Sequence, residues 1–391
     1  MTDRTSVLHS LTRTTGAGHV RLAGTWDVPG QSPAEVWFEV EGPAEDLDRI
    51  RLNANAFLVA LLVPGMERGT DLRVDHAVTP ELLFQINESV VPLLASMLPE
   101  LTPVRLSAAE AAAPMPREGR SGASTGMSCG IDSFTTLIAN RRAEVPEAQR
   151  ISRLVFHDVG AAGQLNEFTD LFNHRFARSE QVAKSEGLPI LKIRSNLTTL
   201  FRTGFVKTHT VRNASAAFVL QDLVESYLYS STFAYSGIHG GNTWDSATAD
   251  PILLPALSTR DFALISSNSA MSRLDKTLAY MATPIHLEHL DICTESDPGT
   301  FQNCGRCGKC GRFLLIAEAE GTIGTYAEIF DIARFRASRW KNVRQLTKLA
   351  HHRKYNPNDR DHLVYLRDKG ADLPLSARAA GRLSAAWSRL R

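Results

Sequence analysis

Two segments near the start of the chain alternate apolar and polar residues, a pattern typical of strands that bury one face. The segments are 19–27 and 35–41, and they predict an antiparallel sheet. Apolar residues then recur at helical spacing across 79–98, where a Thr-Pro pair provides the helix start, and a further strand is expected at 104–106. We therefore expect residues 1–115 to form a smaller N-terminal α+β domain.

The region that follows alternates short apolar strands with amphipathic helical stretches. Strands are predicted at 154–156, 190–193, 232–235 and 262–265, and helices near 131–142, 164–186, 213–230 and 271–282. This alternation predicts an α/β fold in which helices cover both faces of a parallel, doubly wound sheet. Ligands of such sheets bind at the carboxyl ends of the strands. The residues expected at that edge include His157, Ser195, Asn196, 236–242 and Asn268.

Composition and charge define the remaining organisation. The segment 108–122 is rich in Ala, Pro, Gly and Arg, which is typical of a linker. Because it separates two different patterns, we divide the chain into the N-terminal domain, a central α/β domain at 122–325 and a helical extension at 326–391. Apolar residues make up 43% and charged residues 22% of the chain, proportions that exclude disordered, fibrous and coiled-coil proteins.

The helical extension is basic. Residues 331–391 contain 15 Lys or Arg against 5 Asp or Glu, whereas the first 330 residues contain 28 against 37. Its expected core-facing apolar stripe consists of Phe335, Trp340, Val343, Leu346 and Leu349. Two interpretations stay open, since such a tail either docks on the acidic remainder of the chain or meets a phosphate-rich partner such as RNA.

No membrane partner is expected. The longest unbroken apolar run, Ala56–Val63, is too short to cross a bilayer, and the first ten residues contain no apolar signal core. We therefore expect a cytoplasmic location.

Four of the five cysteines lie close together in the sequence: Cys293, Cys304, Cys307 and Cys310. Their spacing allows two Cys-x-x-Cys steps and an earlier cysteine to hold one tetrahedral ion, so the sequence predicts zinc. A disulfide set is disfavoured in a reducing compartment. An iron–sulfur cluster is disfavoured because neither a fourth cysteine nor a proline follows the run. Since four sulfurs leave no open coordination position, we expect the zinc to be structural.

A loop of small residues precedes the first helix of the central domain. It consists of Ser128, Cys129, Gly130, Ile131, Asp132 and Ser133. Backbone N–H groups at a helix N-terminus can hold phosphate, the serine hydroxyls can donate to it, and Asp132 can reach a phosphate-bound Mg²⁺. The alternative is an ordinary capped helix, because Ser and Asp are preferred caps.

The loop resembles the Ser-Gly-Gly-x-Asp-Ser pyrophosphate loop of the PP-loop family of ATP pyrophosphatases. The Cys-x10-Cys-x2-Cys-x2-Cys cluster resembles the zinc site of the 7-cyano-7-deazaguanine synthases within that family, and the two motifs occur in the expected order. Between them, His157 to Gly160, Arg194 to Leu197 and Ser272 to Lys276 are also similar to the family. The likeness covers about 124–321 and implies a sheet of the PP-loop (HUP) type.

The resemblance implies an AMP-forming ligase or synthase that binds ATP and Mg²⁺. Such an enzyme cleaves ATP between the α and β phosphates and transfers AMP to an oxygen of its substrate. Arg273 and Lys276 are then expected to neutralise the pyrophosphate, with Asp132 near Mg²⁺ and His157 near the nucleotide. Among histidines expected at the strand edge, His239 is our first candidate for a proton carrier because glycines flank it.

Two features bear on the function: the residue at position 129 and the kind of atom, nitrogen or sulfur, that attacks the adenylate. The family usually has Gly where this chain has Cys129, so either its φ is negative or the phosphate cradle is altered. Only this cysteine remains outside the cluster, which favours nitrogen transfer from an amine or ammonia to a small carboxylate, giving an amide or nitrile. Thiolation of a nucleobase or tRNA and a catalytically silent nucleotide-binding module stay open. So do an RNA or protein acceptor at the basic tail and a homodimer.

Overall fold

The computed structural model describes residues 5–115, 118–161, 169–295, 301–352 and 357–389. These residues divide into two compact units. Unit 1 comprises Met1–Ser128, Ala139–Ser231 and Ile238–Ser267, and unit 2 comprises Cys129–Ile138, Thr232–Gly237 and Asn268–Arg391. The loop predicted to bind phosphate therefore lies in unit 2 except for its first residue, Ser128.

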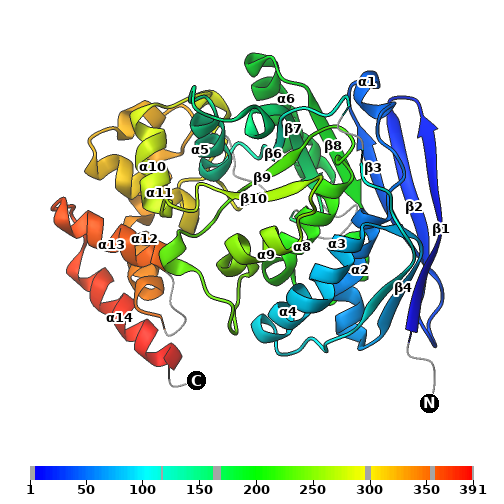
Figure 1. Cartoon of the computed structure of the whole chain (residues 1–391). Coiled ribbons are helices and arrows are strands. Elements are labelled where there is room, and N and C mark those ends of the chain that lie inside the picture. The colour runs from blue at the N-terminus through cyan, green and yellow to red at the C-terminus, as the bar shows by residue number, and fades with distance from the viewer. Residues whose placement is uncertain (1–4, 116–117, 162–168, 296–300, 353–356, 390–391) are drawn as a thin grey trace. The chain divides into compact units, whose positions relative to one another are not determined.

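Unit 1 is built on a sheet of ten strands in the order β10-β9-β6-β7-β8-β3-β2-β1-β4-β5 (Figure 1). The strands are β1 (Thr5–Gly16), β2 (His19–Asp27), β3 (Ala34–Glu41), β4 (Asp71–Val78), β5 (Leu106–Ala111), β6 (Ala123–Gly126), β7 (Ile151–Asp158), β8 (Ile190–Ser195), β9 (Ser226–Ser230) and β10 (Ala263–Ser267). The pairs β1–β2, β2–β3 and β3–β8 are antiparallel, and the other neighbouring pairs are parallel. The α/β class predicted from the sequence is therefore confirmed, and the sheet is mostly parallel.

The N-terminal strands continue the same sheet. The alternation that predicted strands at 19–27 and 35–41 is confirmed, and it buries Val20 and Leu22 of β2 and Phe38 of β3. Strand β3 pairs antiparallel with β8, with Phe38 opposite Ser195. Unit 1 therefore contains residues from both sides of the expected linker.

The helices of unit 1 flank its sheet (Figure 1). They are α1 (Ala44–Leu47), α2 (Ala54–Arg68), α3 (Pro80–Gln85), α4 (Val91–Met97), α6 (Thr169–Glu186), α7 (Leu197–Leu200), α8 (Phe205–Phe218) and α9 (Asp250–Ala256). A π-helical turn joins α3 to α4, and single 3₁₀ turns occur at Glu147–Gln149 and Ser246–Ala249.

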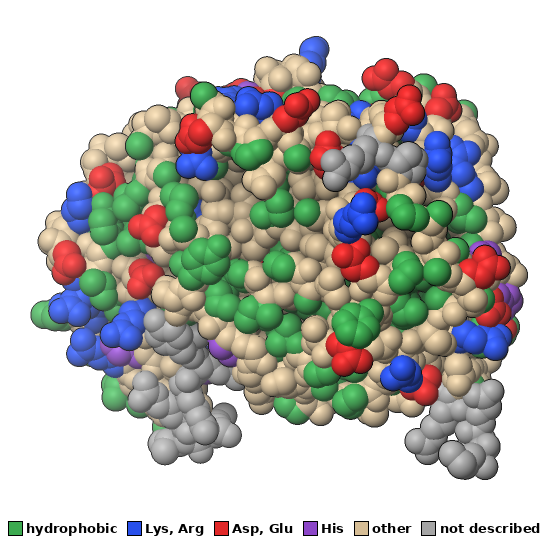
Figure 2. Space-filling view, viewed as in Figure 1, with side chains coloured by type: hydrophobic (Ala, Val, Ile, Leu, Met, Phe, Trp, Pro, Cys, Tyr) green, Lys and Arg blue, Asp and Glu red, His purple; other side chains and the backbone are tan. Residues whose placement is uncertain are grey.

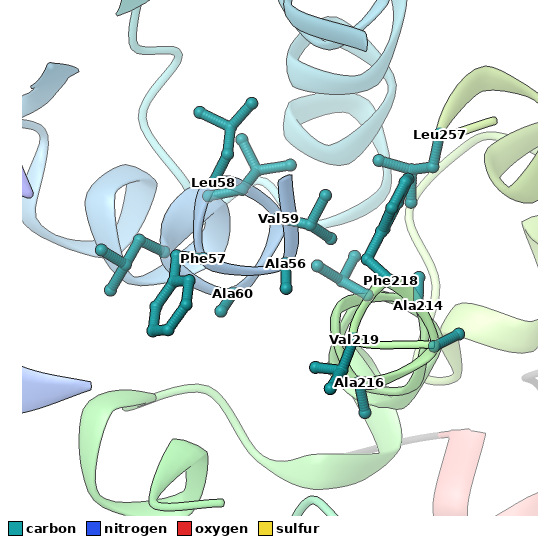
Figure 3. Packing of buried hydrophobic residues seen from close by; sticks show 14 of the residues in the cluster. Ala56, Phe57, Leu58, Val59, Ala60, Ala214, Ala216, Phe218, Val219 and Leu257 are labelled. Carbon is teal, nitrogen blue, oxygen red and sulfur yellow. The ribbon is translucent and has the colours of Figure 1, made fainter. Parts of the chain in front are cut away.

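Helix α2 is buried on all sides, as its unbroken apolar run requires. Ala56 and Val59 of α2 point toward α8, whose Phe218 packs in the same cluster (Figure 3). The Asn53 side chain accepts a hydrogen bond from the N–H of Ala56 and starts the helix, and Gly69 ends it at φ 61°. This pair of helices joins the N-terminal part of unit 1 to its later part.

Unit 2 is helical in its described residues. Its helices are α10 (Arg273–Ala282), α11 (Gly308–Ala319), α12 (Ile332–Ala350), α13 (Pro357–Asp368) and α14 (Leu375–Arg389), with 3₁₀ turns at Tyr235–Gly237, Leu287–His289 and Ile323–Tyr326. Helix α5 (Ile131–Asn140) begins in unit 2 and ends in unit 1. No helix within the described residues combines the length and the apolar character needed to cross a bilayer.

Two predicted elements are wrong. The strand expected at 232–235 is instead β9, at Ser226–Ser230, and the helix expected at 213–230 is α8, which ends at Phe218. Apolar residues between the two elements continue the helical spacing although the chain there forms turns. The predicted helix is therefore too long at its C-terminal end. Helix α6 begins at Thr169, and the part of the predicted helix at 164–168 lies outside the described residues.

The basic extension forms α12, α13 and α14, with α12 packed against α14. Phe335, Val343 and Leu346 of α12 are buried, as the apolar stripe predicts, whereas Trp340 is 45% exposed. Its indole N–H donates to the hydroxyl of Ser376, which holds the ring at the surface. Over these helices, Lys and Arg side chains lie beside hydrophobic ones (Figure 2).

Candidate functional site

Four cysteines of unit 2 bring their sulfurs together. The Sγ atoms of Cys293, Cys304, Cys307 and Cys310 all lie within 4.8 Å of one another, and all four residues are buried. Zn–S bonds of about 2.3 Å place the sulfurs of a tetrahedral site about 3.8 Å apart. The group could therefore hold a metal ion such as zinc, as its spacing in the sequence predicts.

The local backbone orients these sulfurs. Cys307 is the N-cap of α11, and its Sγ accepts a hydrogen bond from the N–H of Cys310 at 3.5 Å. The Sγ of Cys304 accepts from the N–H of Cys307 at 3.3 Å. Gly305 has φ 67°, and a Cβ there would lie 2.2 Å from the carbonyl oxygen of Asp331. Only glycine fits this turn without displacing the chain.

Three of the four cysteines, Cys293, Cys307 and Cys310, also hydrogen-bond to one another through their side chains. Bonds from the thiols of Cys293 and Cys310 lower the pKa of Cys307. The pKa of Cys293 is raised chiefly by its bond to Cys307, and that of Cys310 by its bonds to Cys293 and Cys307. Thiols that share protons in this way release them when a metal ion takes their place. The donor set therefore fits a thiolate-binding metal.

A second cluster in unit 2 lies at the start of helix α5. The Asp132 carboxylate forms an ion pair with the Arg273 guanidinium at 2.7 Å, and its other oxygen lies 3.8 Å from the Nζ of Lys276. Lys276 is only 1% exposed. The buried Nε of Arg273 makes no hydrogen bond within the described residues. The structure thus brings together the three residues predicted to handle phosphate and Mg²⁺.

Further charges extend this cluster. Arg312 contacts the buried carboxylate of Asp359 at 2.9 Å. The pKa of Asp359 is raised by its burial, against the opposing effect of Arg312 and Arg273. Burial is the main cause that lowers the pKa of Lys309. The positive charge of Arg273 lowers this pKa further, and the carboxylate of Asp132 raises it. The Lys309 side chain is exposed to solvent.

Among the printed contacts of the described residues, cations outnumber carboxylates in this cluster. Four cations, Arg273, Lys276, Lys309 and Arg312, meet two carboxylates there, Asp132 and Asp359. Of the four cations only Lys276 is buried, and a buried positive charge is costly unless an anion accompanies it. Because the N-terminus of α5 adds its own partial positive charge, the arrangement favours a bound anion.

The loop before α5 holds a left-handed residue. Cys129 has φ 57°, so the first of the two alternatives, a negative φ, is excluded, and the residue adopts the conformation that glycine would favour. Such a conformation costs a non-glycine residue roughly 1–2 kcal/mol. The Cys129 carbonyl accepts a hydrogen bond from the N–H of Asp291 at 2.8 Å, and the residue is 1% exposed. Burial in the turn offsets the strain.

The remaining loop residues form the first turn of the helix. Ile131 begins α5 and is buried, and the Gly130 carbonyl accepts from the N–H of Phe134 at 3.0 Å. The Ser133 hydroxyl also donates to the Gly130 carbonyl, at 2.9 Å. Ser128 is exposed and belongs to unit 1. The residues of the loop therefore divide between the two units.

The carboxyl ends of β7 and β8 in unit 1 carry the other residues predicted at the strand edge. The Ser195 hydroxyl donates to the Asp158 carbonyl at 2.9 Å and ties β8 to β7. Asn196 bonds the backbone of β3 through both atoms of its amide, accepting from Trp37 and donating to Glu35. Both side chains therefore hold backbone in place.

His157 lies at the end of β7. Its Nδ1 is 3.0 Å from the Oδ1 of Asn213, its ring stacks on Tyr227 with centroids 5.6 Å apart, and its buried Nε2 has no hydrogen-bond partner within the described residues. Burial lowers the pKa of His157 to about 4, the bond to Asn213 opposing the shift. The imidazole is therefore neutral at pH 7.

His239, the first candidate for a proton carrier, is exposed in unit 1. Its backbone N–H donates to the carbonyl of Thr248 at 2.9 Å, and its ring makes no hydrogen bond within the described part of the chain. It belongs to a different unit from Asp132, Arg273 and Lys276. The structure does not bring His239 into the charged cluster.

Sequence reasoning missed several of the charged residues. Lys309 lies between Cys307 and Cys310, which suggests only a counter-charge for the sulfurs, and Asp359 lies in the basic tail without a local motif. An acidic residue at a helix start in a basic segment is the signal that could have pointed to Asp359. Nothing in the sequence pairs it with Arg312.

Comparisons with known proteins add no assignment to this geometry. No family model, no curated protein and no solved structure matches the chain.

Proposed function

We propose that unit 2 binds the phosphates of ATP at the loop before α5, and that the protein is an AMP-forming enzyme. The observation that carries the proposal is the charged cluster, in which Arg273 and a buried Lys276 meet Asp132 at a helix N-terminus. Its excess of cations favours a polyanion, and helix N–H groups suit phosphate oxygens. The resemblance of the loop to PP-loop ATP pyrophosphatases specifies the nucleotide.

The residues of the cluster divide the work of adenylation. A substrate carboxylate oxygen forms a bond to the α-phosphorus while the α–β bridging bond breaks, so negative charge develops on the leaving pyrophosphate. Arg273 and Lys276 neutralise that charge, and Asp132 holds both cations in position. Mg²⁺, when bound with ATP, would neutralise further charge. Asp132 would be its nearest protein carboxylate, because it lies at the start of α5.

Nitrogen is the favoured nucleophile. Sulfur transfer requires a reactive cysteine, and Cys129 is 1% exposed, while the other cysteines form the group of four. An amine or ammonia would therefore attack the adenylate and release AMP, which leaves an amide. Where ammonia is the nucleophile, a second ATP would adenylate the amide oxygen, and loss of that oxygen with AMP and of two protons would leave a nitrile. Thiolation and a silent nucleotide-binding module remain outcomes of the tests.

The four cysteines are proposed to hold a structural zinc ion. Cys304, Cys307, Cys310 and Cys293 supply all four positions of a tetrahedral site, so none is left for substrate. The ion, when bound, cross-links the start of α11 to the preceding loop. Because α11 carries Lys309 and Arg312, this cross-link also positions two cations of the cluster.

A mass-spectrometric screen tests the activity. Purified protein is incubated with ATP, Mg²⁺ and a metabolite extract, and new AMP adducts are sought together with pyrophosphate. We expect a carboxylate-dependent adenylate from the native protein and at least tenfold less from Arg273→Gln, with Arg336→Gln as the control because Arg336 is exposed on α12. ATP binding without pyrophosphate under any condition would identify a silent module instead.

A further inference from the structure

Helix α14 of unit 2 packs closely on α12 and leaves its largest side chains at the surface. A Cβ on Gly381 would lie 2.7 Å from the carbonyl oxygen of Arg344, so only glycine fits at this crossing without displacing α12. Leu375, Leu383 and Trp387 are instead 76%, 72% and 63% exposed. A helix that only completes a core shows the reverse arrangement, and large apolar side chains gathered at the surface are typical of an interaction site.

Helix α12 supplies positive charge beside these residues. It contains six Lys or Arg, and neither α12 nor α14 contains Asp or Glu. Lys341 and Arg344 are exposed and Lys348 is partly exposed, and none of the three forms an ion pair within the described residues. Because like charges repel, a second copy of this face is disfavoured as the partner, and a polyanion is favoured.

Two exposed indole rings lie beside these cations. The indole N–H of Trp340 donates to the hydroxyl of Ser376 at 3.0 Å, and the guanidinium of Arg344 lies 5.9 Å from the centre of the same ring. Arg344 also donates to the hydroxyl of Ser384 at 3.1 Å. Trp387 follows Ser376 by about three helical turns, so it lies on the same side of α14, about 16 Å farther along the helix axis. Ser384, the partner of Arg344, lies between these two positions.

Indole rings with cations between them suit a single strand of nucleic acid. Unpaired bases stack on indole rings, and the phosphates between the bases pair with Lys and Arg. An acidic protein segment would neutralise the cations but would offer no row of planar rings to the indoles. A duplex keeps its bases stacked on one another and away from the indoles. The combination of exposed rings and unpaired cations therefore favours the single strand.

We propose that one face of α12 and α14 binds single-stranded nucleic acid through Trp340, Lys341, Arg344, Lys348 and Trp387. Bases stack on the two indole rings, and the three cations hold the phosphates. Neither contact reads the identity of a base, so binding should not depend on the base sequence. The face lies within unit 2, shares no residue with the charged cluster at the start of α5, and does not require ATP.

Fluorescence anisotropy of the full-length protein tests this face, with a fluorescein-labelled thymidine decamer as the probe. A labelled abasic decamer has the same phosphates and no bases. We expect the thymidine decamer to bind at least fivefold more tightly than the abasic decamer, because stacking adds to the phosphate contacts. Unlabelled polyglutamate should compete more weakly than an unlabelled thymidine decamer. Excess ATP and Mg²⁺ at constant ionic strength should not displace the probe, because the strand binds outside the charged cluster.

Two variants separate stacking from charge. Trp387→Leu keeps an apolar side chain and removes the indole, so it should weaken binding of the thymidine decamer at least fivefold and leave binding of the abasic decamer unchanged. Lys341→Gln should weaken both, and should reduce the dependence of log affinity on log salt concentration by about 0.7. Arg260→Gln, which removes the same charge from an exposed position in unit 1, should do neither.

Several results would overturn the proposal. The native protein would bind neither decamer, or would bind both equally, if the indoles stack no bases. Polyglutamate that competes as well as the thymidine decamer would identify an acidic protein as the partner. Displacement of the probe by ATP would assign the strand to the loop before α5, and an unchanged preference for thymidine in Trp387→Leu would remove this indole from the site. ATP binding is measured separately, so failure here leaves the proposed nucleotide site standing.

Discussion

At the residue scale, Cys129 shows how the chain keeps a glycine-like conformation without glycine. Its φ of 57° lies in the left-handed region that glycine favours, and a hydrogen bond from the N–H of Asp291 to its carbonyl helps to hold it. The side chain is buried, so its packing offsets the free-energy cost of the positive φ. The residue therefore shapes the turn, and its thiol is buried.

Substitutions at position 129 should follow backbone strain. Cys129→Ala retains an unbranched side chain and should change the free energy of unfolding by about 1 kcal/mol or less, while ATP binding and zinc content stay unchanged. Cys129→Val places a branched Cβ at positive φ and should destabilise by more than about 2 kcal/mol. Urea denaturation measures both. Loss of activity in a stable Cys129→Ala protein would support sulfur chemistry instead.

Two buried histidines give the protein a defined pH dependence. Burial lowers the pKa of His157 and of His362 to about 4. The unfolded chain therefore binds protons more tightly than the folded one between pH 6.5 and 4, so the contribution to stability is complete above pH 6.5 and is lost as the pH falls to 4. Each histidine contributes up to about 3 kcal/mol across this window.

Denaturation in urea at pH 7 and at pH 5 measures this loss. We expect His157→Gln and His362→Gln each to reduce the difference in unfolding free energy between the two pH values. A native protein equally stable at both would show that these imidazoles are already protonated in the fold.

At the element scale, helix α11 connects the cysteine group to the charged cluster. Its N-cap and first turn carry Cys307 and Cys310, and the same stretch carries Lys309 and Arg312. Because both sets of residues share one helix start, fixing the sulfurs also fixes the cations. Metal binding and anion binding should therefore be coupled.

Removal of the metal should expose this coupling. We expect about one zinc per chain by elemental analysis, and chelation should lower the midpoint of thermal unfolding by at least about 5 °C. ATP affinity should fall as well, because Lys309 and Arg312 lose their fixed positions. Cys310→Ser should reproduce both effects, with Cys129→Ala as the matched control. Iron in place of zinc, or a fully stable metal-free protein, would contradict this account.

At the scale of the whole molecule, the sheet of unit 1 joins strands from the beginning and the middle of the chain. Alternation along β2 and β3 was enough to predict the strands, and the βα pattern was enough to predict the parallel part. Neither pattern predicts that β3 pairs with β8, because register between distant strands depends on packing such as that between α2 and α8. The same limit applies to the site: motifs found Asp132, Arg273 and Lys276, but not Asp359.

Deletion of residues 1–115 tests this arrangement. The truncated chain would leave the edge of β8 without β3 and the apolar face of α8 without α2. We therefore expect it to be insoluble or to lack a cooperative unfolding transition by circular dichroism. A soluble truncated protein that unfolds cooperatively would show that 1–115 is an independent domain.

The most direct test of the central claim is calorimetric titration of the zinc-loaded, full-length protein with ATP and Mg²⁺. The account predicts that ATP binds one site per chain and that AMP binds at least tenfold more weakly, because AMP lacks the β and γ phosphates. Arg273→Gln and Lys276→Met should each weaken ATP binding at least tenfold, while Arg336→Gln should not. ATP that fails to bind the native protein, or that binds Arg273→Gln and Lys276→Met as tightly as the native protein, would contradict it.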